Sequence, residues 1–347
     1  RVESLSNGVL GLLTSGSLAI HAMGAGYAYA TGNQGRHGIK QLDRLLSNGA
    51  IVVWDYFEKW VPYVIGARSE IVVAMDWTEF DDDGHSTIAI NLTTSHGRAT
   101  PLIWLSVEKN DLKDRRNGYE DKLLRRFKEC LPIGVKVTLL ADRGFCDTEL
   151  MAELSHNLGF DYVIRIRKNI KITNHKGEQR SAIEWLGTGR KTRTLKKATM
   201  TQMNYPVGTL VVAHENGMKD AWCLASSHEE ISTQQMLNYY SKRWSIETWF
   251  RDTKSARFGF SMKSMHTKSV TRRDRLWLLA AFAVTLMTLL GQVSEELGYD
   301  RTLKANTVKT RTHSLFRQGQ MIFEAIPNMK EMWLRPIMER FSELLMT

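Results

Sequence analysis

The order of strand-like and helix-like segments between residues 71 and 166 limits the possible fold more than any other feature of the sequence. Three apolar, β-type runs follow one another closely, and after them helical and strand-like patterns alternate. The predicted elements are strands at 71–77, 86–93 and 102–107, a helix at 119–131, a strand at 135–140, a helix at 147–158 and a strand at 161–166. This β-β-β-α-β-α-β order predicts an α/β fold with a mixed sheet flanked by helices.

Two of the predicted strands carry an acidic residue at or near their ends. Asp76 interrupts the apolar run IVVAMDWTEF, and Asp142 follows the strand-like run VKVTLLA directly before a glycine turn. Burying a carboxylate at the end of an apolar strand is costly unless it is paired or bound to a metal ion. An Asp at a strand end can equally form a turn or cap a helix, and Asp83 or Asp147 could substitute in a looser alignment. Asp76 and Asp142 are therefore candidate metal ligands.

A third acid lies on a predicted helix at residues 240–254, with the sequence YSKRWSIETWFRDTK. On a helical wheel, five of its polar side chains fall within an arc of roughly 80°. They are Tyr240, Arg243, Glu247, Arg251 and Lys254. A solvated surface helix would mix acids and bases more evenly, although a charged surface helix remains the alternative. One carboxylate among several bases suits a site that holds a metal ion and binds phosphates around it.

The Tyr-x2-Arg-x3-Glu-x6-Lys spacing of this helix resembles the signature of one family, with every spacer intact. The family is the hairpin-forming, cut-and-paste DDE transposases of bacterial insertion sequences, the insertion sequence four group. Its members carry Asp in a D-x-T setting on the first strand and an A-D-R sequence ahead of the next helix. The chain has Asp76-Trp77-Thr78 and Ala141-Asp142-Arg143 at these places. The resemblance covers about residues 70–260 well and the flanks more loosely.

The resemblance implies a ribonuclease H-like core and a catalytic triad of Asp76, Asp142 and Glu247. These residues would hold two Mg²⁺ (or Mn²⁺) ions for hydrolysis at a transposon end, hairpin formation and later joining to target DNA. Carboxylates without a histidine or cysteine cage are the ligands that magnesium prefers. The implied partner is double-stranded DNA, as terminal repeats and target, bound by a homodimer.

The resemblance also implies roles in DNA binding for residues around the triad. Tyr240, Arg243, Arg251 and Lys254 would contact backbone phosphates, and a basic segment adds Arg165 and Lys168. Trp222 lies in the strand-like run DAWCLASS. An aromatic residue in a β run is commonly a core residue, but family members carry a tryptophan here that stacks on a base extruded during hairpin formation. Both interpretations of Trp222 are open at this point.

The sequence pattern divides the chain into four parts. Strand-like runs at 192–200, 209–214 and 221–225 are separated by turn residues, which predicts β-hairpins and an all-β insertion at 167–227. The ribonuclease H-like core would then comprise residues 71–166 and 228–262. Residues 1–70 are predicted to be helical, and the resemblance implies that they bind DNA ends. Residues 263–347 form a predicted helical C-terminal region.

The composition favours a polyanionic partner. The 47 Lys and Arg residues outnumber the 37 Asp and Glu residues, for a formal net charge of +10. The 3 cysteines are odd in number and widely spaced, which argues against a disulfide framework or a zinc ribbon and fits a reducing cytosol. No signal peptide is visible. Together with the resemblance to transposases of bacterial insertion sequences, which implies a bacterial protein at the nucleoid, these features lead us to expect a cytoplasmic location.

One segment, residues 276–293, is uncharged and long enough to be considered as a membrane span. Thr285, Thr288 and Gln292 interrupt it, and it stands alone in a chain of otherwise soluble composition. We therefore predict a buried core helix and no membrane partner.

Two other functions remain open. A ribonuclease H-like nuclease or resolvase without strand transfer would need the acids but not the full set of bases on the helix. A catalytically inactive DNA-binding relative would keep the positive charge and lose the acids, and the presence of all three acids argues against it.

Overall fold

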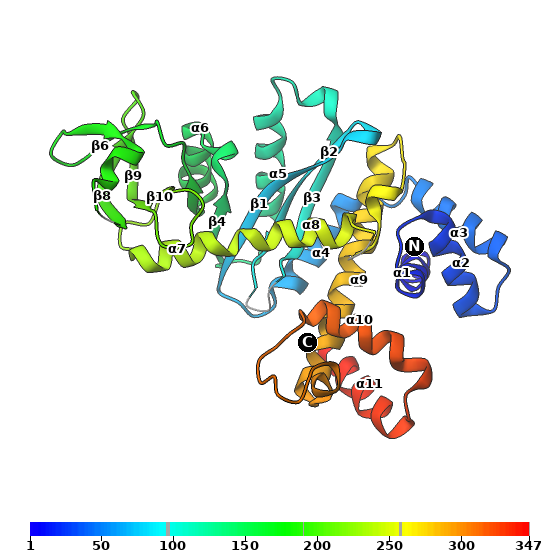
Figure 1. Cartoon of the computed structure of the whole chain (residues 1–347). Helices are drawn as coiled ribbons and strands as arrows, with labels where there is room; N and C mark the ends of the chain where they lie inside the picture. Colours follow the sequence, from blue (N-terminus) through cyan, green and yellow to red (C-terminus); the bar gives the residue numbers. More distant parts are fainter. Residues whose placement is uncertain (95–97, 190, 257–258, 347) are drawn as a thin grey trace.

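The computed structural model describes residues 1–94, 98–189, 191–256 and 259–346 (Figure 1). Its centre is a sheet of ten strands in the order β3-β2-β1-β4-β5-β10-β9-β8-β6-β7. The strands are β1 (Glu70–Phe80), β2 (His85–Leu92), β3 (Thr100–Glu108), β4 (Lys136–Ala141), β5 (Asp161–Arg165), β6 (Lys171–Thr173), β7 (Gln179–Ser181), β8 (Thr192–Met200), β9 (Tyr205–Ala213) and β10 (Trp222–Ser226). The predicted mixed sheet flanked by helices is confirmed.

Helices lie on both sides of this sheet and at both ends of the chain. The α-helices are α1 (Val2–Ser15), α2 (Ile20–Thr31), α3 (Gly35–Ser47), α4 (Val53–Ile65), α5 (Arg116–Cys130), α6 (Thr148–Ala152), α7 (Thr233–Lys242), α8 (Trp244–Lys254), α9 (Val270–Glu296), α10 (Leu315–Ala325) and α11 (Glu331–Met346). Short helical turns are η1 (Asp81–Asp83), η2 (Lys109–Leu112), η3 (Arg143–Phe145), η4 (Glu153–Leu158), η5 (Ala182–Leu186), η6 (Met262–Ser264), η7 (Tyr299–Leu303) and η8 (Ile326–Asn328).

The first half of the sheet brings the two strand-end acids together. Strands β1, β2 and β3 form an antiparallel meander, whereas β4 lies parallel to β1, and β5 lies parallel to β4. Every residue of β2 is buried, because both faces of the sheet are covered there. Ala74 of β1 is level with Leu140 of β4. Asp76 and Asp142 each follow this pair by two residues, so both lie just past the last β1–β4 pair, at the same edge of that part of the sheet. Asp76 is not at the end of its strand as predicted, because β1 continues to Phe80 beside β2.

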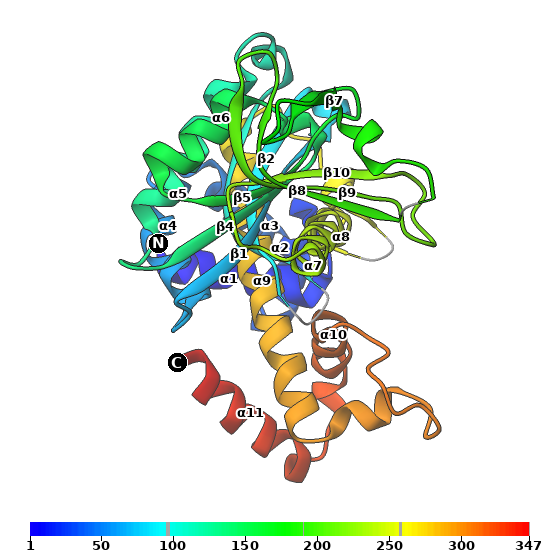
Figure 2. The same ribbon diagram turned by 90° about the vertical axis from the view of Figure 1, so that its left-hand side faces the viewer.

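The segment predicted as a β insertion continues the same sheet. Strand β10 pairs antiparallel with β5, with Leu224 opposite Arg165, and β9 and β8 extend the sheet from there. The three predicted strand-like runs correspond to β8, β9 and β10, and the turn η5 is the helical element within the segment. Figures 1 and 2 show these green strands as a lobe beside the core. The lobe is thus joined to the core by main-chain hydrogen bonds as well as by the chain itself.

The predicted helix at 240–254 begins earlier and has a break. Ser232 caps α7 by accepting a hydrogen bond from the Gln235 amide (3.1 Å), so the helix starts at Thr233. Arg243 separates α7 from α8 but has helical φ and ψ values of −53° and −37°. Figure 1 shows the two helices running almost in line across the molecule, from below the lobe to the front of β1.

The N-terminal helices cross at glycines. A Cβ atom on Gly38 of α3 would lie 2.1 Å from the Gly24 carbonyl oxygen of α2. A Cβ atom on Gly11 of α1 would lie 2.5 Å from the Met23 carbonyl oxygen. Because a side chain would clash at these crossings, the glycines let three short helices pack backbone to backbone.

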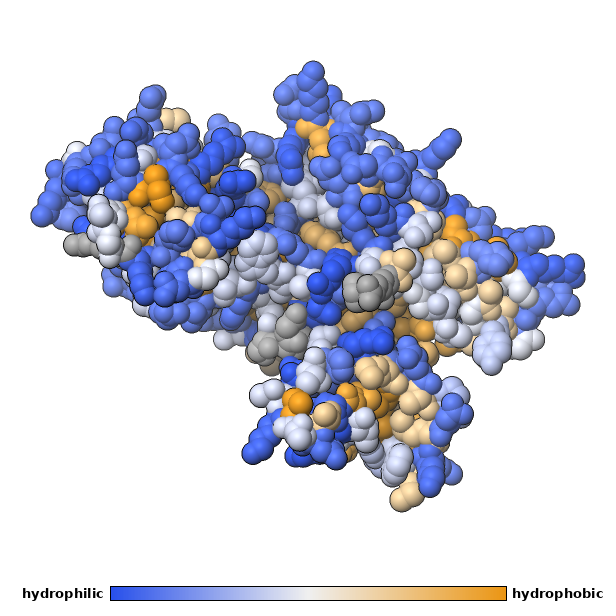
Figure 3. All heavy atoms as spheres, in the orientation of Figure 1, coloured by the Kyte–Doolittle hydropathy of each residue, from blue (hydrophilic) through white to orange (hydrophobic). Residues whose placement is uncertain are grey.

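Helix α9 contains the uncharged segment at 276–293 and runs through the middle of the molecule (Figure 1). Among the described residues, it is long and apolar enough to cross a membrane, and the pair α1 and α2, bent by 97°, would pass the same test as one broken span. Within α9, 67% of the apolar window is buried inside the protein, as predicted for a core helix. Figure 3 shows mainly hydrophilic side chains over the face seen in Figure 1, with smaller apolar patches.

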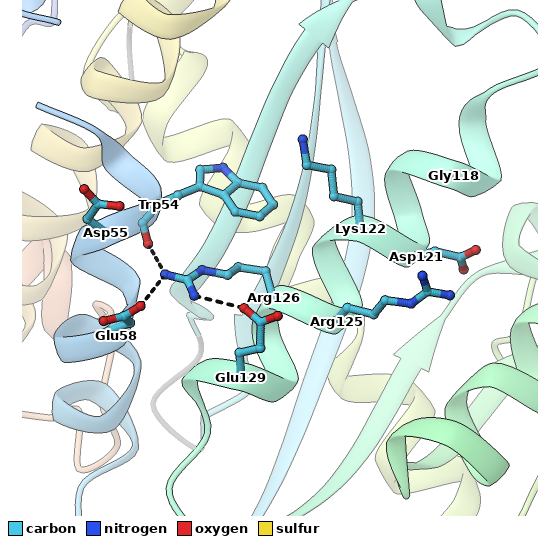
Figure 4. A pocket seen from close by; sticks show the side chains of 9 residues that line it. All are labelled: Trp54, Asp55, Glu58, Gly118, Asp121, Lys122, Arg125, Arg126 and Glu129. Carbon is cyan, nitrogen blue, oxygen red and sulfur yellow. Dashed lines mark hydrogen bonds and ion pairs between the residues drawn. The ribbon is translucent and has the colours of Figure 1, made fainter.

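A hollow of about 640 Å³ lies between α4 and α5, and hydrogen bonds of Arg126 connect the two helices there (Figure 4). Arg126 of α5 donates hydrogen bonds to the Trp54 carbonyl oxygen (2.7 Å) and the Glu58 carboxylate (2.9 Å) of α4. It also pairs with Glu129 on its own helix (2.9 Å). The lining of this hollow includes none of the candidate site residues, and the contacts of Arg126 fasten the N-terminal helices to the core.

Candidate active site

Asp76 and Asp142 lie at adjacent strands but make different contacts. The Asp76 side chain is 19% exposed and points toward α8. Asp142 caps η3, because its Oδ1 accepts a hydrogen bond from the Gly144 amide (2.7 Å). The turn-capping role that the sequence left open for Asp142 is therefore present in this structure. It occupies one carboxylate oxygen and leaves the other available.

Arg243 joins Asp76 to Glu247. Its Nη1 donates to Asp76 Oδ2 (3.1 Å) and its Nη2 donates to Glu247 Oε1 (2.7 Å). The Arg243 side chain is 5% exposed, whereas that of Glu247 is 45% exposed. The sheet edge and the signature helix thus bring the carboxylates together around one guanidinium group.

The acids repel one another. The pKa of Asp76 is raised to about 6, mainly by burial; Arg243 lowers it, and the nearby Asp142 and Glu247 carboxylates contribute to the rise. Carboxylates held this close favour the arrival of a cation. Among the described residues, however, no three His, Cys, Asp or Glu side chains are arranged to hold a metal ion as they stand. Arg243 occupies the space between two of the three acids.

Tyr240 and Trp222 form an aromatic pair beside the acids. The Tyr240 side chain is buried, at 1% exposure, and its ring centre lies 4.9 Å from that of Trp222 in an edge-to-face arrangement. Trp222 itself is only partly buried. The two residues come from α7 and β10, so the pair links the lobe to the signature helix. The phosphate contact expected of Tyr240 stays a prediction.

Lys254 is anchored at the far end of α8. Its Nζ donates to Thr78 Oγ1 (3.0 Å) and to the Glu79 carbonyl oxygen, and it lies 4.6 Å from the centre of the Phe80 ring. Burial lowers its pKa, and the positive charge of Lys263 lowers it further. Lys254 therefore fixes α8 to β1 directly downstream of Asp76.

The other basic residues predicted to bind DNA lie at different distances from the acids. Arg251 is half exposed, and its Nε lies 3.8 Å from Asp252. Arg165 donates to the Ala221 carbonyl oxygen (3.3 Å), next to Trp222. Lys168 is paired with Asp220 (2.9 Å). Arg165 and Lys168 therefore belong to the surroundings of Trp222 and not to those of the three carboxylates.

The acids considered as substitutes for the triad have other partners. Asp83 pairs with the buried Arg273 and accepts from the Thr267 amide (3.3 Å). Asp147 caps α6 through the Glu149 amide (2.9 Å). Both carboxylates therefore make local structural contacts in this structure.

Two charged residues that contact the signature helix, Arg98 and Lys263, were not predicted from the sequence. Asp252 is buried on α8 and is paired with Arg98 (2.6 Å), from the segment between β2 and β3. Lys263 lies against the end of α8 and lines a hollow with Lys254. Lys263 lies outside the helical pattern, and Arg98 is far from Asp252 in the sequence, so no local signal identified them.

The comparisons with known proteins agree with this arrangement. A family model described as the transposase DDE domain matches residues 68–286, which include the three acids and all of α7 and α8. No curated protein matches the chain. The match covers more than half of the chain, so the chain belongs to the transposase DDE domain family.

Proposed function

We propose that this transposase cuts DNA at transposon ends by hydrolysis and closes the cut end into a hairpin before joining it to target DNA. The observation that carries the proposal is the convergence of Asp76 and Glu247 on Arg243, with Asp142 at the same sheet edge. The signature of α7 and α8 further supports membership of the insertion sequence four group.

The donor set fits hard divalent cations, because it consists of carboxylates, two of which, Asp142 and Glu247, lie close enough to Asp76 to raise its pKa. Asp76, Asp142 and Glu247 would hold two Mg²⁺ or Mn²⁺ ions, which supply charge stabilisation at the attacking and leaving oxygens of a phosphodiester. Glu247 is half exposed and can turn away from Arg243 at little cost. Arg243, released from one carboxylate, would then be available to a DNA phosphate.

The proposed reaction needs one base to leave the stacked DNA end, because a hairpin cannot close over a fully stacked duplex. Trp222 is only partly buried and its ring packs against Tyr240, which suits it to stack on such a base. Stacking on an aromatic side chain contributes about 1–3 kcal/mol per base. Arg165 and Lys168 flank Trp222 and would contact the phosphates of the displaced nucleotide.

The N-terminal helices are proposed to bind the terminal repeats. Helix α3 exposes Arg36, His37, Lys40 and Arg44, and no ion pair involves them among the described residues. The acid of the same helix, Asp43, is paired with Arg272 (2.7 Å). A helix with an uncompensated basic face suits the negatively charged groove of duplex DNA.

The active complex is proposed to be a homodimer on DNA, in the cytoplasm at the nucleoid. Helix α11 exposes apolar side chains such as Trp333 (48%) and Met338 (41%), which provide surface for a protein partner. A nuclease or resolvase without strand transfer is the alternative function, because it would use the same carboxylates.

One experiment separates the two functions. Purified protein is incubated with Mg²⁺ and a candidate terminal-repeat duplex taken from the DNA on either side of the reading frame, and the products are resolved on a denaturing gel. Hairpins and strand-transfer products would support the transposase mechanism. Nicks alone would show a nuclease, and an unchanged duplex would contradict both.

A further inference from the structure

A hollow of about 280 Å³ lies beside the C-terminal end of α8, and its Lys263 has none of the roles proposed above, whereas Arg251 and Lys254 are already expected to contact phosphates. Its lining consists of Thr78, Phe250, Arg251, Lys254, Ser255 and Lys263. Three of these residues are cations and none is an acid. Two lysines that face one hollow repel each other, and an anion between them would remove that repulsion.

Lys263 is held in place by the turn that carries it. The Phe260 amide donates to the Asp252 carbonyl oxygen (2.8 Å), and the Ser261 amide donates to the Ser255 carbonyl oxygen (3.1 Å). Ser261 has a φ of 58°, in the left-handed region that non-glycine residues rarely adopt. Met262 is fully buried. The turn is therefore fixed against α8, and Lys263 needs no rearrangement of the main chain to reach the hollow.

The neighbouring acids are already paired. Glu79 and Asp81 are the carboxylates nearest to Lys254, and both bind Lys109, at 2.7 Å and 2.6 Å. Lys254 uses two of its three N–H groups on Thr78 and Glu79, which leaves one for a ligand. Lys263 is exposed and has no ion pair among the described residues. The hollow therefore keeps its positive charge.

The hollow is in line with the three carboxylates. Glu247, Arg251 and Lys254 share one face of α8, and seven residues of helix span about 10 Å. Thr78 follows Asp76 by two residues, so their side chains lie on the same face of β1. Phosphates of one DNA strand advance by about 3.4 Å per nucleotide along the duplex axis. A strand bound at the carboxylates would thus present a phosphate to the hollow two or three nucleotides away.

We propose that this hollow binds a backbone phosphate of the DNA strand that is cut, about two or three nucleotides from the scissile bond, with Lys263 as a direct ligand beside Lys254. The proposal rests on the proposed function, because it concerns DNA engaged at the carboxylates. To the proposed function it adds one DNA-binding residue outside the signature, Lys263, and the position on the DNA strand that this residue contacts.

The test measures binding to a fluorescent candidate terminal-repeat duplex, with Ca²⁺ in place of Mg²⁺, by anisotropy at about 50 and about 200 mM salt. Lys263→Ala is compared with Lys268→Ala, which removes the same charge from an exposed lysine outside the hollow. Loss of one phosphate contact should shrink the affinity ratio between the two salt concentrations by about 3.5-fold in Lys263→Ala. Lys268→Ala should behave as wild type, and Lys263→Arg should restore the ratio.

A second measurement locates the contact. Duplexes carry a single uncharged methylphosphonate at successive positions of the cleaved strand. One position, two or three nucleotides from the cut, should weaken binding of the wild type clearly more than binding of Lys263→Ala, which keeps only the Lys254 contact. If the two alanine variants have equal salt dependence, or every methylphosphonate weakens Lys263→Ala as much as wild type, the hollow is not a phosphate site. If the wild type does not bind the duplex, the proposed function fails first.

Discussion

Arg243 offers a direct test of how the acids are held together before metal and DNA arrive. Replacing it with Met keeps much of the side-chain volume and removes the guanidinium group from between Asp76 and Glu247. Removing one partner of a buried ion pair costs about 3–5 kcal/mol, whereas an exposed pair contributes less than about 1 kcal/mol. Asp76 is mostly buried and Glu247 is half exposed. We therefore expect a loss of about 3 kcal/mol in the free energy of unfolding without metal.

The loss should appear as a fall of roughly 4 °C in the thermal midpoint by differential scanning fluorimetry, because the unfolding entropy of a chain of 347 residues is about 0.7 kcal/mol/K. Mg²⁺ should recover more stability in Arg243→Met than in wild type, because the ion no longer competes with the guanidinium for the carboxylates. At about pH 5 the loss should be smaller, since Asp76, with a pKa of about 6, is then largely protonated and has less need of a counter-charge.

Arg251→Met is the matched control. It removes the same charge from the same helix but from a side chain that does not contact the triad. If both variants have the same midpoint, or if Mg²⁺ stabilises both equally, Arg243 does not neutralise the acids and the reasoning is refuted. Neither measurement depends on catalytic activity.

Three further predictions concern the acids, the aromatic pair and a buried carboxylate. Asp76→Asn, Asp142→Asn and Glu247→Gln should each abolish cleavage while DNA binding by gel shift stays nearly intact. More than about a tenth of the wild-type rate in any one would remove that residue from the site. Trp222→Ala should slow hairpin formation far more than nicking, with partial rescue by an abasic nucleotide at the flipped position. An insoluble variant, or an equal loss of both steps, would make Trp222 a core residue. Burial raises the pKa of Glu120 to about 7, so the folded state binds its proton more tightly than the unfolded chain does. Glu120 should therefore contribute a fall of roughly 3 kcal/mol in wild-type stability as pH rises from about 4.5 to about 7. Glu120→Gln, which can still accept from Trp77, should lose this part of the pH dependence and keep the part due to Asp76. Identical pH profiles from urea unfolding would contradict the assignment.

Much of the core could be predicted from the sequence because its signals are local. Apolar, β-type runs located β1, β4 and β5 and drew attention to Asp76 and Asp142, which interrupt or follow two of them. The spacing of Tyr240 to Lys254 predicted a helix, which α7 and α8 provide, and the Arg243–Glu247 bond joins two residues of the predicted face. These features depend on the periods of strands and helices, which the sequence contains directly.

The remainder depends on contacts between distant parts of the chain. A helical wheel gives the direction of Arg243 but not the carboxylate that it meets, so the bond to Asp76 could not be foreseen. The pairing of β10 with β5 joins segments that are far apart in the sequence. The hairpin signals of the insertion predict its own strands but not this pairing with the core. The ion pair between Asp252 and Arg98 likewise joins two segments that are far apart in the sequence, and no local pattern indicates it.

The continuity of the sheet has a mechanical consequence. Strand β10 carries Trp222 and is separated from β4, which leads to Asp142, by β5 alone. Neighbouring strands lie about 4.8 Å apart, so the lateral offset between the two is about 10 Å and is set by main-chain hydrogen bonds. The sheet therefore fixes the distance between Trp222, on which a base would stack, and the carboxylates, at which the DNA backbone would be cut. A lobe on a flexible tether would not hold this distance constant, so Trp222 could not be kept at one position relative to the carboxylates.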